Sequence, residues 1–300
     1  MYKFQRRSAL GALAAAMVTA AMPGYVAALP TGGIMRRIAS GRHHASFEFG
    51  DLKIIALRDG YVDMPPTRLR QKSGDTFDTL PANIPLVGGQ LRLSVNAYLI
   101  IEGKQHVLID TGASNSWHPT MGALLEGLRE AGIDRQEITQ VALTHTHEDH
   151  VNGLIAPDGS EAFPRATRVF VPKEETSAFT GRLARLKDRL TPIDDKFAVS
   201  ERITTVKAAG HSAGHTAYDV VSSAGHLLVW RDIVHVPSIQ FEYPEIAWEF
   251  DDDQARARGA RQVLMELATR PNYLIAGAHL DFPGIGHVVR REDKFVFKAI

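Results

Sequence analysis

Apolar and polar positions in the first half of the chain follow the pattern of short strands separated by turns. Asp59-Gly60 marks a turn, and residues 65–90, with four prolines and a Gly-Gly pair, predict a loop. Residues 29–46 show no usable periodicity, and we expect an exposed arm there. Runs of apolar and β-branched residues predict strands at 47–58, 61–64, 93–101 and 105–110, the last two joined as a hairpin.

The second half alternates strand-like and helix-like segments. Apolar residues at helical spacing, closed by Gly132, predict a helix over 119–131. Further helices are predicted at 173–190, a charged stretch, and at 251–269. Short buried strands are predicted at 138–143, 166–171, 203–207, 217–222, 226–232 and 273–278. This alternation predicts an α/β layered domain with its functional residues at the strand ends.

The first 28 residues have the layout of an export signal. Basic residues without any acid precede an apolar run at 9–22, and small residues end at Ala28, where we expect cleavage. The run has 14 residues, fewer than the roughly 20 that span a bilayer, so we expect no stable membrane anchor. The Arg6-Arg7 pair resembles a twin-arginine signal, with ordinary secretion as the alternative. Both predict a periplasmic or secreted protein.

Composition narrows the chemistry of the remaining chain. Of the 300 residues, 44% are hydrophobic, enough for a buried core, and no low-complexity linker divides residues 29–300, so we expect a single domain. Removing the signal leaves 31 basic against 34 acidic residues, a net charge of −3 that gives no support to nucleic acid as a partner. The chain has no cysteine, so any metal must be held by histidines and carboxylates.

The segment after the predicted strand 138–143 concentrates groups that bind metals. Three histidines and one aspartate fall within six residues of the run Thr144-His145-Thr146-His147-Glu148-Asp149-His150. His145 and His147 lie on one side of an extended segment and can hold one ion, while Asp149 and His150 can reach a second. A solvated polar loop is the alternative, but the buried strand before the run favours a site for two ions.

Further metal-binding groups occur at later strand ends. Two histidines flank small residues in Gly210-His211-Ser212-Ala213-Gly214-His215, and small residues allow a close backbone approach to a crowded centre. His215 can complete the ligands of the first ion. Asp232 and His279 each follow a predicted strand. An aspartate can bridge two cations through its two oxygens, which an imidazole cannot do.

Together with Leu108-Ile109-Asp110-Thr111-Gly112, these motifs resemble the metallo-β-lactamase superfamily over about residues 95 to 280. The resemblance implies a four-layer αββα sandwich with a dinuclear site between two sheets. It implies that Asp110 is structural, and that Arg231 stands where the family usually has glycine. The implied ligands are His145, His147 and His215 for one ion, Asp149, His150 and His279 for the other, and Asp232 as the bridge.

A closer resemblance, to the methyl parathion hydrolase branch, covers most of the chain after the signal. It rests on residues 50–60, 110–113, 150–154 and 278–287. That branch contains organophosphate hydrolases and relatives that act on lactones and aryl esters, and the resemblance suggests a homodimer. The substrate does not transfer with the fold.

The resemblance implies a hydrolase in which a hydroxide held between two divalent ions attacks the carbonyl of a lactone or an aryl ester. Zinc suits these ligands, with manganese, iron and cobalt as alternatives. Asp149 and Asp232 are the candidate catalytic residues, and the sequence leaves open whether Asp149 or a metal-bound water protonates an alkoxide leaving group.

Other functions remain as alternatives. The first is hydrolysis of organophosphate triesters of the methyl parathion type. The second is a β-lactamase, against which Asp232 counts because the cysteine-free β-lactamases have no bridging aspartate. The third is a metal-binding protein without activity, or an oxygen-reducing relative, although His147-Glu148-Asp149 keeps the hydrolase pattern.

We assign Trp117 and Phe282 to the substrate pocket, with packing in the core or against a helix as the alternative for each. Phe179 is expected in the core. His211 is expected either to orient a ligand or simply to be hydrogen-bonded. Structural or surface positions are expected for His106, His118, His226, His235 and His287.

Overall fold

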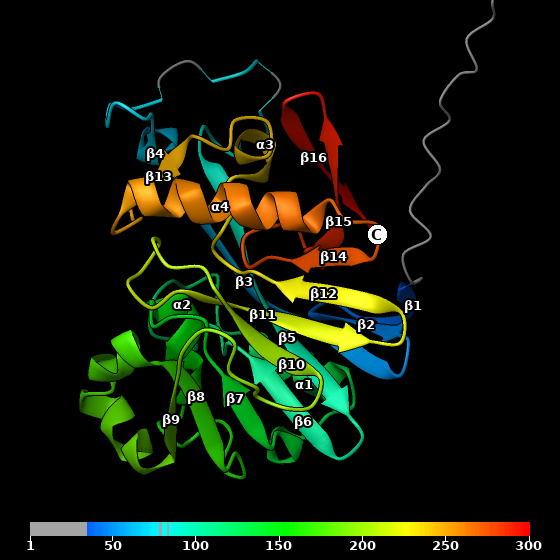
Figure 1. The fold of residues 1–300 in the computed structure, drawn as a ribbon. Coiled ribbons are helices and arrows are strands. Elements are labelled where there is room, and N and C mark those ends of the chain that lie inside the picture. Colours follow the sequence, from blue (N-terminus) through cyan, green and yellow to red (C-terminus); the bar gives the residue numbers. More distant parts are fainter. Residues whose placement is uncertain (1–34, 78–79, 83) are drawn as a thin grey trace, which may run out of the picture.

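Two β-sheets packed face to face form the centre of the molecule (Figure 1). The computed structural model describes residues 35–77, 80–82 and 84–300, so the predicted export signal lies outside the described residues. The first sheet has the order β1 (Met35–Ser40), β2 (His44–Phe49), β3 (Leu52–Met64), β5 (Leu91–Glu102), β6 (Gln105–Ile109), β7 (Gln140–Ala142), β8 (Arg168–Pro172) and β9 (Leu190–Ile193). The second has the order β10 (Ile203–Lys207), β11 (Thr216–Ser222), β12 (Gly225–Val229), β14 (Tyr273–Ala276), β15 (Ile285–Arg291) and β16 (Lys294–Ala299).

Short helices connect these strands, and one long helix lies on the second sheet. The strands β4 (Leu69–Arg70) and β13 (Ala247–Trp248) form a separate antiparallel pair. No helix among the described residues has the length and apolar content needed to cross a membrane. The α-helices are α1 (Leu124–Glu130), α2 (Glu148–Val151), α3 (Pro237–Gln240) and α4 (Gln254–Ala268). The 3-10 helices are η1 (Pro66–Arg68), η2 (Arg135–Glu137), η3 (Asn152–Leu154), η4 (Lys173–Ala178) and η5 (Gly181–Arg189).

The apolar run in β3 is explained by burial on both faces of its sheet. Side chains alternate along a strand, so Ile54 and Ala56 point into the core between the two sheets. Ile55 and Leu57 point to the opposite face, against the helices that cover the first sheet. A strand buried on both sides is apolar at successive positions rather than at every second one.

Helices cover the outer face of each sheet. Leu128 of α1 and Leu183 of η5 belong to the apolar cluster on the first sheet. Met265 of α4 packs in the cluster that contains Leu228 and Ile275 of the second sheet. The order of layers is therefore helix, sheet, sheet, helix, which confirms the predicted αββα sandwich.

Several predicted elements are wrong in detail near the N-terminus. The expected arm over residues 29–46 includes the strands β1 and β2 from residue 35 onward. The expected turn at Asp59-Gly60 is a bulge within β3, where the pairing with β5 shifts register. Gly60 allows it, because a Cβ there would lie 2.0 Å from the carbonyl oxygen of Thr120.

Two predicted helices also differ. The helix predicted over 119–131 begins only at Leu124, because Gly122 has a φ of 98°, outside the helical region. The helix predicted over 173–190 is the 3-10 helices η4 and η5, which Phe179 and Thr180 separate. Phe179 is fully buried in the core, as expected, and Thr180 has an extended backbone. The strands β15 and β16 were not predicted.

The topology gathers the ends of several strands at one end of the sandwich. β6 and β7 run parallel in the first sheet, and β12 and β14 run parallel in the second. β11 is antiparallel to β12, so it begins where β12 ends. The loops that follow β6, β7, β12 and β14, and the loop that enters β11, therefore meet at this end.

A substitution at Gly153 tests the packing at this end. Its backbone N–H donates to the carbonyl of Gly112 at 2.8 Å, and a Cβ at Gly153 would lie 1.8 Å from the carbonyl oxygen of Thr111. We expect Gly153→Ala to lower the free energy of unfolding by about 2–3 kcal/mol or more, because the backbone must move apart. Unfolding in urea measures the change.

The matched control is Gly259→Ala in the middle of α4. No atom lies within 4 Å of a Cβ at this exposed position. Alanine is the better helix former by roughly 1 kcal/mol, so this variant should be slightly more stable. Equal changes in the free energy of unfolding for both variants would show that the close backbone contact at Gly153 does not limit stability.

Candidate metal centre

The predicted ligands come together at the end of the sandwich where the strand ends meet. His145, His147, Asp149 and His150 follow β7, His215 precedes β11, Asp232 follows β12 and His279 follows β14. All are buried except His147, which is half-buried. The structure therefore brings these residues together from four separate segments of both sheets. His215 lies with its ring centroid 5.2 Å from that of His145, but the ligand atoms that converge within 4.8 Å of one another beside His145 and His147 include His211 and not His215.

The carboxylate of Asp232 lies at the centre of this cluster. Its Oδ2 atom is surrounded by the Nε2 atoms of His279 at 3.1 Å, His150 at 3.3 Å, His211 at 3.3 Å, His235 at 3.5 Å and His145 at 3.8 Å. Its Oδ1 atom is buried and has no hydrogen-bond partner among the described residues. One carboxylate oxygen thus faces five imidazole nitrogens, a set of donors that suits a bound divalent cation.

Hydrogen bonds from Nδ1 orient three of the imidazoles. His150 donates to Asp110 at 2.7 Å, His215 to the carbonyl of Ala208 at 3.0 Å, and His279 to the carbonyl of Ser94 at 2.8 Å. These bonds leave the Nε2 lone pairs directed toward the cluster. Such partners behind a ligand fix its tautomer at metal sites.

Unpartnered nitrogen atoms show that this donor set fits divalent cations. The buried Nε2 atoms of His145, His150 and His215 have no hydrogen-bond partner in the described part of the chain. Buried polar atoms are seldom left unpaired in proteins. Imidazole nitrogens and carboxylates are the ligands that zinc and related ions prefer, so these residues fit such ions.

The electrostatics of the cluster also favour bound cations. Burial lowers the pKa of His215 to about 4 and holds that of His145 well below its usual value, so both rings are neutral and able to bind metal. Burial raises the pKa of Asp232, but nearby histidines, His150 foremost, keep it well below its ordinary value. The cluster therefore combines charged carboxylates with the neutral imidazoles of His145 and His215. Burial lowers the pKa of His150, but Asp149, Asp232 and Asp110 raise it well above its usual value.

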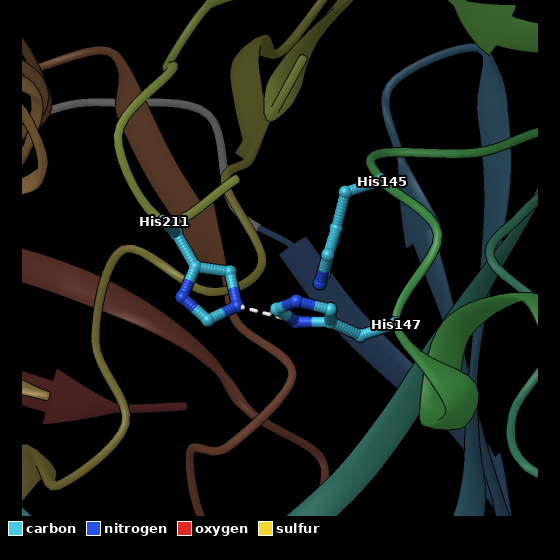
Figure 2. Close-up of side chains that lie close together, drawn as sticks. All are labelled: His145, His147 and His211. Carbon is cyan, nitrogen blue, oxygen red and sulfur yellow. Dashed lines mark hydrogen bonds between the residues drawn. The ribbon is translucent and has the colours of Figure 1, made fainter. Parts of the chain in front are cut away.

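His211 lies directly beside the paired histidines of the loop after β7 (Figure 2). Its Nε2 is 3.0 Å from Nδ1 of His147, and its Nδ1 is 2.9 Å from Oδ1 of Asp251. Burial lowers its pKa, but hydrogen bonds to Asp232 and Asp251 raise the pKa of His211 to about 9. Both of its nitrogens are therefore engaged.

His235 and Asp251 also lie at the cluster, although the sequence did not indicate it. His235 is buried and stacks on His279 and on Trp248, with ring centroids 5.1 and 5.5 Å away, so it takes the structural rather than the surface position that we expected, but directly beside the cluster. Its place three residues after Asp232 was the one signal available. Asp251 stood at the start of a predicted helix, and nothing in the sequence pointed to His211 as its partner.

A cavity of about 650 Å³ opens onto the cluster. Trp117 lies on its wall, at the position we assigned to the substrate pocket. Phe282 does not, because it packs partly against the core and lines a separate cavity beside Pro283 and Phe297. The apolar wall of the first cavity consists of Val62, Met64, Leu93, Trp117, Trp248 and Phe250.

The cavity walls carry acidic residues and histidines. No lysine or arginine is among the described residues that line it. Glu249 is paired with Arg68 and Arg70, and Asp251 is held by His211. The carboxylates of Glu148 and Asp252, both exposed, form no ion pair with described residues. The entrance is therefore negatively charged.

Comparison with known proteins identifies the family. The model of the metallo-β-lactamase superfamily matches residues 91–298, more than two thirds of the chain. The chain belongs to the metallo-β-lactamase superfamily.

Two solved structures share the fold. The hydrolase AbOPH of the beta lactamase superfamily has a TM-score of 0.75 and 26% identity, over 87% of this chain and 99% of that one. AidC, a dizinc quorum-quenching lactonase, has a TM-score of 0.74 and 21% identity, over 86% of this chain and 97% of that one. The second likeness shows the fold alone.

The chain matches its curated relatives over only a part of their length. A hydroxyacylglutathione hydrolase of Actinobacillus pleuropneumoniae is 32% identical over 27% of this chain and 30% of its own length. The metallo-beta-lactamase domain-containing protein 1 of Xenopus laevis is 35% identical over 23% of this chain and 28% of its own length. The chain thus matches less than a third of these relatives.

Glu175 of η4 joins two of the ligand loops of this metallo-β-lactamase fold. Its carboxylate accepts hydrogen bonds from the hydroxyls of Thr146 and Ser212, both at 2.6 Å, and from the backbone N–H of Gly214 at 2.9 Å. Thr146 lies between His145 and His147. Sequence analysis missed Glu175, since its partners lie 29 to 39 residues away.

We expect Glu175→Gln to lower the free energy of unfolding by about 1–3 kcal/mol, because an amide has one acceptor oxygen in place of two and turns its NH₂ toward a donor. Glu174→Gln is the control, since Glu174 is exposed on the same helix, and it should change stability by less than about 0.5 kcal/mol. Equal effects in urea unfolding would show that Glu175 does not hold the loops.

Proposed function

We propose that the chain is a dinuclear metal-dependent hydrolase that acts on a lactone or an aryl ester. The observation that carries this proposal is the Oδ2 atom of Asp232, which lies within 3.8 Å of five imidazole nitrogens while Oδ1 has no partner. A carboxylate in this position can bridge two ions, and the surrounding Nε2 atoms can complete both sets of ligands. The likeness to the hydrolase AbOPH over 87% of the chain supports a hydrolase.

We assign His145, His147 and His215 to one ion, Asp149, His150 and His279 to the other, and Asp232 to both. His215 is preferred to His211 for the first ion because its buried Nε2 has no other partner. Both nitrogens of His211 are engaged, with Asp251 behind and with His147 and Asp232 in front. His211 then orients His147 rather than binding the ion.

When bound, two divalent ions, zinc by preference, lower the pKa of water toward about 7 and polarise a carbonyl oxygen. The chain supplies the carboxylates around them. Burial raises the pKa of Asp149, but His150 and then His279 hold it below its ordinary value, so Asp149 is charged and able to bind a cation. A carboxylate with a lowered pKa is a weak base, so this shift supports Asp149 as a metal ligand and does not support it as the proton donor to an alkoxide leaving group.

The cavity suits a substrate with an apolar acyl or aryl portion. Trp117, Trp248 and Phe250 line one wall, and Trp117 and Phe250 are more than a third exposed. Large apolar side chains on a cavity wall bind apolar groups, while the few polar groups fix orientation. Phosphotriesters with aryl groups fit the same description and remain the second candidate, favoured by the resemblance to methyl parathion hydrolases.

Charge separates these substrates from other substrates of the superfamily. Glu148 and Asp252 are not neutralised, and no described lysine or arginine lines the cavity to receive an anionic group. Lactones, simple esters and phosphotriesters are neutral. β-Lactams and glutathione thioesters carry carboxylates, which these residues repel, so we place them behind the neutral substrates.

The test of the proposed function is a comparison of substrates on one preparation of the protein. Metal content per chain is measured first, followed by rates with an acyl-homoserine lactone, a 4-nitrophenyl ester, methyl parathion and a β-lactam. We expect two ions per chain, with the lactone or ester hydrolysed fastest. Fastest turnover of methyl parathion would favour the second candidate, and no hydrolysis of any substrate would contradict the proposal.

Replacing the bridge should separate metal binding from folding. We expect Asp232→Asn to fold but to retain at most one ion per chain, with hydrolysis reduced by a factor of 10² or more, because an amide cannot bridge two cations. Atomic absorption and the 4-nitrophenyl ester assay measure both effects. Asp188→Asn, an exposed residue on η5, is the control. Unchanged occupancy and rate in Asp232→Asn would show that Asp232 is not the bridge.

The acidic entrance predicts a dependence on substrate charge. A neutral 4-nitrophenyl ester should be hydrolysed with a kcat/KM at least about fivefold above that of the 4-nitrophenyl hemiester of glutaric acid, a difference of about 1 kcal/mol at exposed charges. The double variant Glu148→Gln with Asp252→Asn should narrow this ratio, and so should 0.5 M salt. A ratio that neither change alters would contradict the role of these two residues.

A further inference from the structure

Arg231 is a buried cation beside the metal centre in a conformation that arginine rarely adopts. It is 0% exposed, and its φ of 51° lies in the left-handed region that favours glycine. Asp110, its ion-pair partner, is also fully buried and has a φ of 57°. Two strained and buried charged residues persist only where the surrounding structure requires them.

The guanidinium of Arg231 connects the two sheets at the site. Arg231 follows β12 of the second sheet, whereas its partners belong to the first sheet or to the loop that follows it. Nε donates to Oδ2 of Asp110 at 2.6 Å, and Nη1 donates to the carbonyl of Asn96 on β5. The guanidinium carbon lies 5.7 Å from the ring centroid of Tyr98.

Asp110 connects Arg231 to His150. The Oδ2 atom of Asp110 that accepts from Arg231 also accepts from Nδ1 of His150 at 2.7 Å. That bond turns Nε2 of His150 toward Asp149 and Asp232, each 3.3 Å away. Arg231 therefore holds in place the carboxylate that orients His150.

Asn96 connects Arg231 to the loop of His279. The side-chain amide of Asn96 donates to the carbonyls of Ala278 at 3.0 Å and Leu280 at 2.8 Å, on either side of His279. The backbone N–H of Asn96 donates to Ala278 as well, at 3.1 Å. The loop that carries His279 is thus fixed to the residue whose carbonyl Arg231 binds.

The ligands of the other ion depend on different partners. His215 is oriented by the carbonyl of Ala208, and His147 by His211. Of that set, only His145 touches the network of Arg231, through the hydroxyl of Thr144, which also donates to Asp110. The contacts of Arg231 therefore connect mainly to the ligands of the ion that we assign to Asp149, His150 and His279.

We propose that Arg231 is a positioning residue for the ion bound by Asp149, His150 and His279, acting through Asp110 and Asn96. This inference rests on the ligand sets of the proposed function. The positive charge of Arg231 balances the buried carboxylate of Asp110, and its second donor fixes β5 against the loop of His279. The other ion is expected to bind largely without it.

The test compares Arg231→Met, which keeps the length of the side chain without its charge, with Arg231→Lys, which keeps the charge. Zn²⁺ affinities of the two sites are measured by competition with a chelator, and Co²⁺ spectra report the ligand geometry. We call the ion of His145, His147 and His215 the first ion and that of Asp149, His150 and His279 the second ion. We expect Arg231→Met to lower the affinity for the second ion about 10- to 100-fold and the affinity for the first ion by less than threefold. Arg231→Lys should lie between this variant and the wild type.

A double variant keeps the proposal testable if Arg231→Met does not fold with Asp110 left unbalanced. Asp110→Asn with Arg231→Met removes both buried charges, and its affinity for the ion bound by Asp149, His150 and His279 should be close to that of Asp110→Asn alone. Asp188→Asn serves again as the exposed control.

Three results would overturn the proposal. They are unchanged affinity for both ions in Arg231→Met, equal weakening of both ions, and an Arg231→Lys variant no better than Arg231→Met. A wild-type protein that binds fewer than two ions would contradict the ligand sets themselves. If the wild type binds two ions and Arg231→Met leaves both affinities unchanged, the role of Arg231 is contradicted while the proposed ligand sets stand.

Discussion

The structure around the site depends on one buried carboxylate surrounded by imidazoles. Asp232 has five histidine side chains within 3.8 Å of a single oxygen atom, and the Nε2 atoms of His145, His150 and His235 have no hydrogen-bond partner among the described residues. Bound cations would satisfy these nitrogen atoms. Removing these charged and polar side chains from water costs free energy, and the rest of the fold holds them together despite this cost.

The fold achieves this by placing strand ends from two sheets beside one another. Each ligand follows or precedes a strand that is buried on both faces, so its backbone is fixed before its side chain reaches the cluster. Three connections then join the loops across the sandwich: Glu175 between the loops of His145 and His215, Asp110 behind His150, and Arg231 between the sheets. In the proposed function, the apolar surface and the exposed carboxylates of the cavity wall select the substrate.

Local patterns allowed part of this arrangement to be predicted. The run from His145 to His150 is contiguous, so its chemistry was visible in the sequence, and the motifs around His215, Asp232 and His279 resemble those of the superfamily. His235, Asp251 and Glu175 were not predicted, because their partners lie far away in sequence and only the packing of the sheets brings them together. The helix expected over 173–190 was wrong for a similar reason: Phe179 enters the core, and the backbone after it is extended.

Anomalous X-ray scattering from crystals of the protein grown with Zn²⁺ is the measurement that tests the central claim most directly. Data collected on the two sides of the zinc absorption edge locate each ion independently of any assay. The account predicts two zinc peaks about 3.5–4 Å apart, one beside His145, His147 and His215 and one beside Asp149, His150 and His279, with Asp232 between them. A single peak, or two peaks that Asp232 does not join, would contradict it.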